Sequence, residues 1–449
     1  MARRGGWRHS WAGWWRSSVP GLWWLGLVLV GVLTLPAAAG PDGVTYNRDI
    51  APLLAANCQA CHRDGEIAPF PLTSYDDAYP RRQKLLRTVE RRKMPPWPPV
   101  PGHGDFVGER RLADADIARL RAWVEAGAPE GDPRDLPPPR TFPALWSAGD
   151  PDAVLAPASA FDVPSGDRDL YRCFVVPTAF AEDRFVSVAE FLPGDRRIVH
   201  HVIGYIDTTG QAEALDRAEP GFGYTCFGGP GFVPRGGLGG WAPGAPPTAM
   251  PEGVGMLLPA GARVVVQVHY HNRTGGTVRD LTRVGLRFAR ATVDKRVRVI
   301  PVLNREFLIP AGAERHVVRA SYTLPPTWHM HAIGISPHMH LLGREMRVTV
   351  TYPDGTSRPL VYIDDWDFHW QGSYRFRTPV PLPGGSRVDV EAVYDNSPRN
   401  RRNPTVPPRD VGWGEGTADE MCIAFIQTTV DSERLGHRPI DTGPLAGQP

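Results

Sequence analysis

The chain has 449 residues, of which 42% are hydrophobic, and a formal net charge of +2 at neutral pH. This length suffices for about three domains of roughly 150 residues each. The balanced charge, without a long basic tract, argues against nucleic acid as a partner, because such proteins rely on contacts with phosphates. The 48 glycines and 48 prolines indicate many turns, which favours short β-strands over long helices.

The first 39 residues have the pattern of an export signal. Four arginines precede a mostly apolar run from Leu22 to Leu35, and three alanines follow. A basic region, an apolar region and small residues at a cleavage site predict export to the periplasm or the extracellular space. The apolar run is short for a membrane span, so a membrane is an expected partner only if the signal stays uncleaved.

Residues 58–62, with the sequence CQACH, have the spacing of a c-type haem attachment site. In such a site two cysteine thiols bond to the haem vinyl groups, and the adjacent histidine binds the iron. A redox dithiol or half of a zinc site is the alternative for a CxxC pair. The chain has no second CxxC motif, and a histidine follows directly. The motif therefore predicts haem c bound through Cys58, Cys61 and His62.

Helical patterns lie on both sides of this motif, with apolar residues three or four positions apart. We expect one helix before the motif, with Asn47 as its cap. A second is expected to begin near Asp76, and a third to run from about Asp114 to Gly127, where a glycine can end it. The segment around the haem motif is therefore expected to be α-helical.

Met94 is the expected sixth ligand of the haem iron. It lies in a proline-rich loop 32 residues after His62, and a thioether ligand raises the potential of a haem. The alternative role of a methionine here is to fill a core. Residues 43–132 resemble a small monohaem cytochrome c, and the proline-rich residues 133–144 are expected to form a stiff linker.

From about Phe142 the sequence changes to short alternating segments separated by turn residues, which predicts antiparallel β-structure. Three groups of histidines lie in this part: residues 200–201, residues 269 and 271, and residues 329–340. The second group contains one His-x-His pair and the third contains two. Since residues i and i+2 of a strand face the same side, such pairs present two imidazoles to one metal ion. Solvated or core histidines are the alternative.

The adjacent histidines His200 and His201 pose a geometric problem, because neighbours on a regular strand face opposite ways. Both can bind one ion only if the strand bulges, or if one ring coordinates through Nδ1 and the other through Nε2. In residues 263–271 the pattern is regular, and alternation places His269 on the strand face opposite to Val264, Val266 and Val268.

Four segments, IVHHVI, VVVQVHY, PHMHLLG and ADEMCIAF, occur in this order. They resemble the signature segments of the copper type II, ascorbate-dependent monooxygenases, the family of dopamine β-monooxygenase and peptidylglycine α-hydroxylating monooxygenase. The resemblance covers roughly residues 145–432. It implies a mainly β fold with two antiparallel, jelly-roll-like β-sandwich domains, residues 145–295 and 296–432. Each domain would hold one copper ion, the two facing each other across a solvent cleft, and residues 433–449 would form a tail.

The resemblance also implies a ligand set for each copper ion. The electron-transfer copper would be held by His200, His201 and His269, and the oxygen-activating copper by His338, His340 and Met421. Three imidazoles suit an ion that cycles between Cu(I) and Cu(II), and a soft methionine sulfur favours Cu(I). Zinc is the alternative metal, but a methionine ligand is foreign to it. His271, His329 and His331 have no certain counterpart in the family, so we expect supporting or structural roles for them.

The remaining cysteines allow one disulfide. In an exported chain cysteines are usually paired or bound to a group, and Cys173 and Cys226 are the natural pair outside the haem motif. The resemblance implies the same pair. Cys422 is left over, and Ala392 stands where animal members of the family have its partner cysteine. We therefore predict a buried free thiol at Cys422.

Three positions depart from the peptide-amidating members of the family. Those members have an arginine, an asparagine and a tyrosine that contact the substrate, where this chain has Ser336, Ile423 and Phe425. The resemblance therefore implies that peptide amidation is not the reaction. An apolar or neutral organic substrate is the hypothesis that these side chains favour.

Two function classes follow from the sequence. The first is an exported haem–copper monooxygenase that hydroxylates a C–H bond of a small or neutral organic substrate with O2. Its electrons would come from an ascorbate-like donor or a redox protein and pass through the fused haem. The second is a non-enzymatic haem and copper protein that carries electrons or handles copper. Two complete ligand sets favour the enzyme, because a carrier needs only one. A β-sandwich that merely retains its histidines is a third possibility.

Overall fold

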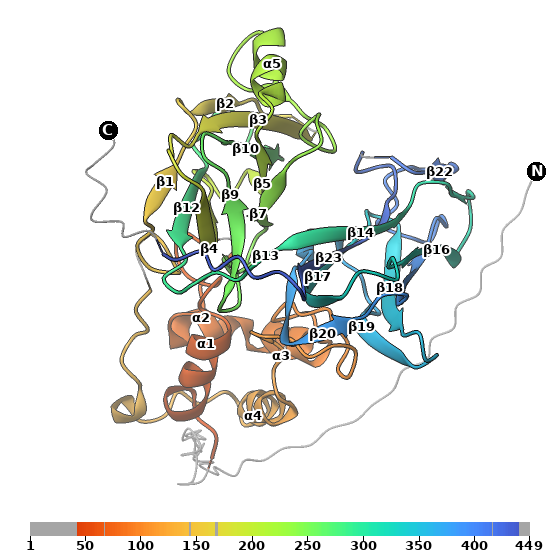
Figure 1. The fold of residues 1–449 in the computed structure, drawn as a ribbon. Helices are drawn as coiled ribbons and strands as arrows, with labels where there is room; N and C mark the ends of the chain where they lie inside the picture. The colour runs from red at the N-terminus through yellow and green to blue at the C-terminus, as the bar shows by residue number, and fades with distance from the viewer. Residues whose placement is uncertain (1–42, 67, 143–144, 167–168, 415, 440–449) are drawn as a thin grey trace, which may run out of the picture. The chain divides into compact units, whose positions relative to one another are not determined.

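The structure of this chain is a computed structural model that describes residues 43–66, 68–142, 145–166, 169–414 and 416–439. The described residues from Val44 onward form one compact unit. The prediction of a mainly β fold built from antiparallel sheets is confirmed, with helices concentrated before residue 136 (Figure 1). The predicted export signal lies outside the described residues. Within the described ranges, none of the helices has the length and apolar character that crossing a bilayer requires.

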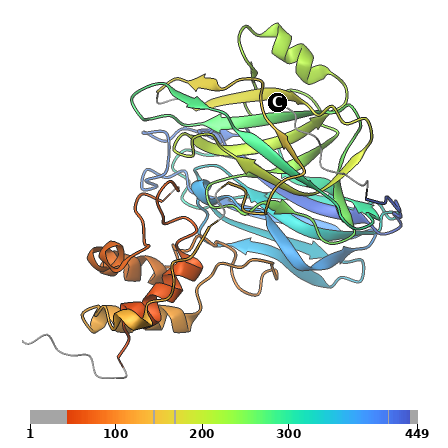
Figure 2. The ribbon, with the colours of Figure 1, turned by 90° about the vertical axis from the view of Figure 1, so that its left-hand side faces the viewer.

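The N-terminal segment is helical, and its helices gather in one group (Figure 2). They are η1 (Tyr46–Ile50), α1 (Ala51–Asn57), α2 (Tyr75–Ala78), η2 (Tyr79–Arg81), α3 (Arg82–Glu90), α4 (Asp114–Glu125) and η3 (Pro133–Asp135). One hydrophobic cluster joins η1, α1, α2, α3 and α4 around Trp123, which is fully buried. The expectation that Asn47 caps the first helix is wrong. Thr45 is the cap, and the buried Asn47 amide donates to the carbonyls of Gly131 and Asp132 instead.

The first β region follows with two larger sheets that share one hydrophobic core. Its elements are β1 (Ala153–Leu155), β2 (Phe161–Val163), β3 (Leu170–Pro177), β4 (Arg184–Leu192), β5 (Val199–Asp207), α5 (Gln211–Ala218), β6 (Tyr224–Thr225), β7 (Gly236–Trp241), β8 (Thr248–Ala249), β9 (Val254–Leu258), β10 (Arg263–Tyr270), β11 (Val278–Asp280), β12 (Arg283–Phe288) and β13 (Lys295–Arg296). One sheet has the order β1-β12-β4-β9-β13, with β8 beside β4, and the other β6-β3-β10-β5-β7. A disulfide joins Cys173 to Cys226, as predicted.

The second β region is built in the same way. Its elements are β14 (Arg298–Asn304), β15 (Leu308–Ile309), β16 (His316–Thr323), β17 (Met330–His338), β18 (Gly343–Thr351), β19 (Ser357–Ile363), η4 (Phe368–Trp370), β20 (Tyr374–Leu382), β21 (Arg387–Tyr394), β22 (Val411–Gly412) and β23 (Cys422–Val430). Two four-stranded sheets, β14-β23-β17-β20 and β16-β21-β18-β19, contribute to one core. Cys422 is a buried free thiol in this core, as predicted.

Part of the N-terminal segment belongs to the core of the second β region. Phe106 is only 3% exposed and packs there, with its ring 5.3 Å from the ring of Phe376. The backbone N–H of Val100 donates to the carbonyl of Tyr362 at 2.8 Å. Residues 97–107, which we expected within the haem segment, are therefore held by the sheet of β19 and by β20.

Candidate metal centres

Two neighbouring strands bring His200, His201 and His269 together, and we call these residues the first histidine group. Strands β5 and β10 are antiparallel, and His269 lies directly opposite His201. The register shifts at the next pair, where Tyr270 lies opposite Val199. His200 is thus the extra residue of a β-bulge. This bulge is one of the two arrangements that would let adjacent histidines face one ion.

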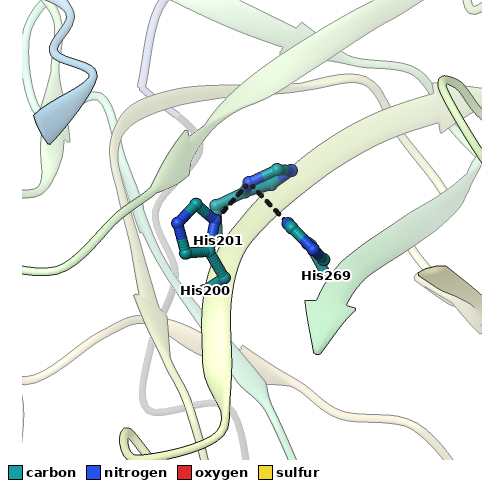
Figure 3. A group of neighbouring side chains, drawn as sticks. All are labelled: His200, His201 and His269. Carbon is teal, nitrogen blue, oxygen red and sulfur yellow. Dashed lines mark hydrogen bonds between the residues drawn. The ribbon is translucent and has the colours of Figure 1, made fainter. Parts of the chain in front are cut away.

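The three rings of the first histidine group converge through their Nδ1 atoms (Figure 3). The Nδ1 atom of His201 lies 3.4 Å from that of His200 and 3.3 Å from that of His269. Within the described residues these three form a cluster whose ligand atoms all lie within 4.8 Å of one another. The alternative with one Nδ1 and one Nε2 ligand is not the arrangement observed.

The electrostatics of the first histidine group suit a metal ion. Burial lowers the pKa of all three rings, and the pKa of His200 falls to about 3, with further contributions from His269 and His369. The rings are therefore neutral at neutral pH, with nitrogen lone pairs available in a confined space. Nearby neutral imidazoles that converge in this way are the donor set that copper or zinc binds. The residues thus fit the copper site that the resemblance implies.

Asp169 is a supporting residue of this group that sequence reasoning missed. Its carboxylate lies 3.3 Å from His269 Nε2, short of regular hydrogen-bond geometry, and accepts from His271 Nδ1 at 2.9 Å. Thr417 Oγ1 donates to the same carboxylate at 2.8 Å. Burial alone would raise the pKa of Asp169, but these three partners hold it well below its usual range. The anion thereby favours the His269 tautomer that leaves Nδ1 free.

Replacement of Asp169 by asparagine is expected to weaken copper binding at the first histidine group. The loss of the anion removes the group that orients His269, and such changes typically cost about 10- to 100-fold in metal affinity. Competition with a copper chelator, followed by metal analysis, measures this effect. A control is Asp162→Asn, because Asp162 lies on β2 and pairs with the exposed Arg279. Equal copper affinity in both variants would contradict the role of Asp169.

His338, His340 and Met421 form what we call the second histidine group. His338 ends β17 and lies opposite Ile423 of β23. Continued by two residues, this antiparallel register places His340 opposite Met421. The rings of His338 and His340 are 5.1 Å apart between centroids. Segments 80 residues apart in sequence thus meet at this site, as the resemblance implies.

Both rings of the second histidine group are oriented through Nδ1. His338 Nδ1 donates to Gln371 Oε1 at 2.6 Å, and His340 Nδ1 donates to the carbonyl of Asp419 at 3.1 Å. These bonds leave both Nε2 atoms free for a ligand. Burial lowers the pKa of His338, and burial together with His338 lowers the pKa of His340 to about 3. Two neutral imidazoles beside a methionine fit a copper ion.

Glu420 is the second residue that sequence reasoning missed. It is fully buried, and its carboxylate accepts from the backbone N–H groups of His340 at 2.8 Å, Leu342 at 2.6 Å and Met421 at 3.2 Å. Burial raises its pKa to about 8, against the effect of these hydrogen bonds. Glu420 thus ties the segment that carries His340 to the segment that carries Met421.

The other histidines of the pattern lie elsewhere. His329 and His331 are at the start of β17, seven or more residues from His338, which corresponds to about 23 Å along a strand. His331 Nδ1 donates to Asp431 at 2.6 Å, and His329 is exposed. His271 supports Asp169. Their contacts are those of supporting or structural residues.

Phe368 lies between the two histidine groups. Its ring stacks on His200 at 5.4 Å between centroids, and it meets the ring of His340 edge-on at 5.8 Å. The resemblance implies a solvent cleft between the two copper centres. In the structure, one buried aromatic ring instead contacts a histidine of each group, so solvent is not all that separates them.

The residues of the predicted haem motif follow helix α1, whose C-cap is Cys58. Cys58 and Cys61 are free thiols despite their CxxC spacing. His62 Nδ1 donates to the carbonyl of Phe70 at 3.0 Å, which leaves Nε2 for an iron atom. Burial lowers the pKa of His62, so that its ring is neutral. Met94 packs against the core of the helical segment.

The metal-free protein is expected to lose stability as the pH falls below about 6.5, the usual pKa of histidine. The pKa values of His200 and His340 are about 3 in the folded chain. Between these values the unfolded chain binds protons that the folded chain does not, so the free energy of unfolding decreases as the pH falls. Thermal melting of the copper-free protein between about pH 7 and 4 measures this loss. The variant His200→Ala should show a shallower decrease, and an unchanged slope would contradict the assignment.

The part of the chain that carries the second histidine group matches a family model. Residues 299–431 match the family model of the copper type II ascorbate-dependent monooxygenase, C-terminal domain. A curated relative from Gallus gallus, DBH-like monooxygenase protein 1, is 22% identical over 291 residues. Both comparisons support the copper type II monooxygenase family. The match with the relative covers 59% of this chain and 45% of the relative, so the chain spans less than half of that protein.

Solved structures are only distantly similar. VP2 of infectious bursal disease virus has a TM-score of 0.20 at 10% identity, with 64% of this chain and 74% of that chain covered. PNGF-II has a TM-score of 0.28 at 8% identity, with 64% and 66% covered. TM-scores this low do not establish a shared fold, and nothing about function follows from them.

Proposed function

We propose that this chain is an exported copper monooxygenase, periplasmic or extracellular, that hydroxylates a C–H bond of a small organic substrate. The observation that carries the proposal is the presence of two histidine groups: three imidazoles whose ligand atoms converge, and His338 with His340, whose rings are 5.1 Å apart in the part that matches the monooxygenase family. One oxygen atom of O2 enters the C–H bond, and the other leaves as water. Each turnover therefore consumes two electrons and two protons.

Copper at the two histidine groups would supply one-electron chemistry and the activation of O2. The side chains around the groups have a different task, which is to fix the ligands before any substrate arrives. Asp169 orients His269, Gln371 orients His338, and Glu420 holds the segment of His340. Rings held in this way need not reorganise during turnover.

The strand face beside His338 suggests the substrate class. Ile423 lies opposite His338, and Phe425 lies opposite Ser336 on the same pair of strands. Alternation along β17 and β23 places these four side chains on one face of the sheet. Phe425 and Ser336 are half-buried, so this face is partly open. It offers apolar contacts and no charged group for a carboxylate, which supports a neutral or apolar substrate.

Electrons are proposed to enter through haem c, held by Cys58, Cys61, His62 and Met94. A haem accepts electrons one at a time from an external donor, either an ascorbate-like reductant or a redox protein, and passes them on one at a time. From the haem segment they would reach the first histidine group and then the second.

The decisive experiment measures O2 uptake by the exported, copper-loaded protein with small aromatic substrates and with peptides ending in glycine. Metal analysis and a reduced-minus-oxidised haem spectrum accompany it. Two copper ions per chain and uptake that depends on the small substrates support the proposal. Copper without substrate-dependent uptake indicates the electron-transfer or copper-handling protein. The absence of stoichiometric copper would overturn both, and faster turnover of the glycine peptides would overturn the substrate class.

A further inference from the structure

The short helix η4 lies close to the haem motif and to both histidine groups. No pattern in the sequence predicts this position. It lies in the connection between β19 and β20, and Asp367 caps it by accepting from the N–H of His369 at 3.1 Å. One turn of helix therefore carries Phe368 and Trp370 at fixed positions. Phe368 is buried and Trp370 is half-buried.

At one end of η4, Phe368 contacts both histidine groups. Its ring is nearly parallel to the ring of His200, at an interplanar angle of 19°, and nearly perpendicular to that of His340, at 80°. A ring in the first arrangement gives broad contact between π-systems. Among the described residues, Phe368 is the aromatic ring that contacts a histidine of each group.

At the other end of η4, Trp370 approaches the haem motif across Gly244, which follows β7. A Cβ atom built on Gly244 would lie 3.5 Å from Cys61 Sγ and 3.7 Å from Trp370 Cζ3. Cys61 and Trp370 thus both lie beside the same small residue, near the position that a Cβ atom would take. Arg110 fixes this junction, because its Nη1 donates to the carbonyl of Gly244 at 2.6 Å. Arg110 itself lies near Cys61, and burial lowers the pKa of its guanidinium.

We propose that η4 is the contact route from the haem attachment motif to both histidine groups, with Trp370 facing the motif and Phe368 facing the histidines. The inference rests on the proposed function and adds the residues that couple its sites. Segments from three parts of the chain meet here: the haem motif, the loop after β7, and η4 of the second β region. Packed side chains couple redox centres better than water does, because electron tunnelling decays steeply with distance through a less dense medium.

The step that this route serves is a single electron transfer. Haem iron is oxidised from Fe(II) to Fe(III), copper is reduced from Cu(II) to Cu(I), and no bond forms or breaks. Trp370 and Phe368 need not be oxidised themselves. Their role is to occupy the space between the sites with packed side chains, and they are therefore positioning residues rather than catalytic ones.

The test uses the full-length protein loaded with haem and Cu(II), without O2 and without substrate. A flash from a photoreductant reduces the haem, and the decay of the ferrous haem absorbance is followed together with the Cu(II) EPR signal. Trp370→Leu is expected to slow this decay at least severalfold, with copper content, EPR parameters and haem spectrum unchanged. Trp370→Phe, which keeps a ring, should stay close to the wild-type rate. Phe368→Leu tests the other end of the route independently and should also slow the decay.

Trp328→Leu is the matched control, because Trp328 is 45% exposed and precedes β17 away from the three sites. If Trp370→Leu and Phe368→Leu transfer electrons as fast as this control, the route is wrong, while the proposed function stands. If the wild-type haem is not reoxidised by copper at all, the relay and the route are both wrong. Substrate-dependent O2 uptake driven by ascorbate then decides separately whether the chain is a monooxygenase.

Discussion

Replacement of His340 by alanine is expected to reduce the copper content from two ions to one per chain and to abolish substrate-dependent O2 uptake. His340 is only 4% exposed, and its Nδ1 is fixed by the carbonyl of Asp419, so its Nε2 has one direction in which to bind. Loss of a direct ligand should exceed the roughly 10- to 100-fold effect of losing a supporting residue. Metal analysis and an oxygen electrode measure the two losses.

The same strand provides the control. His331→Ala removes a histidine from the other end of β17, where the ring bonds to Asp431. This variant should keep two copper ions and most of the activity. If it lost copper while the His340 variant kept both ions, the ligand assignment would be wrong. The Cu(II) EPR signal of the first histidine group should persist in the His340 variant.

Replacement of Glu420 by alanine is expected to cost at least about 3 kcal/mol of the free energy of unfolding and to release copper from the second histidine group. The buried carboxylate accepts from three backbone N–H groups, at His340, Leu342 and Met421. Each unsatisfied buried donor costs about 1 to 3 kcal/mol. Without this carboxylate, the segments of His340 and Met421 are no longer tied together.

Chemical denaturation and metal analysis test this expectation together. Glu391→Ala is the control, because Glu391 forms an exposed pair with Arg319, and such pairs contribute about 0 to 1 kcal/mol. Comparable stability losses in the two variants would show that Glu420 is not a structural tie. Retention of both copper ions after a large loss of stability would show that it does not organise the site.

Regular hydrophobic patterns in the sequence predicted those site residues whose position follows from burying one face of a strand or helix. Strand β10 lies between β3 and β5, so the valines of its alternating pattern fill the core, and the opposite face carries His269. The need for a bulge followed from two adjacent histidines, and the structure has that bulge at His200. Helix α4 is similar, because its apolar spacing matches the buried side chains around Trp123.

Single polar residues with distant partners could not be found in this way. Asp169 contacts residues about 100 and 250 positions away in sequence, and Gln371 reaches His338 from a different loop. Neither stands in a repeating pattern, since each contact depends on how whole sheets pack. Asn47 was misassigned for the same reason. A polar residue before a helix looks like a cap, but its partners here are backbone carbonyls of a segment about 85 residues further on.

Phe106 and its neighbours have a consequence for how the chain can be divided. Residues 97–107 return from the helical segment into the core of the second β region. The helical segment with the haem motif is therefore packed against that region and is not connected to it by a flexible linker alone. Excision of residues 43–132 would remove an aromatic side chain from that core and expose Tyr374 and Phe376. In the intact chain, the proposed electron transfer from haem to copper would need no diffusional search between separate domains. The rate of this transfer should be insensitive to solvent viscosity. A helical domain from another protein that lacks an equivalent of residues 97–107 could not replace this one.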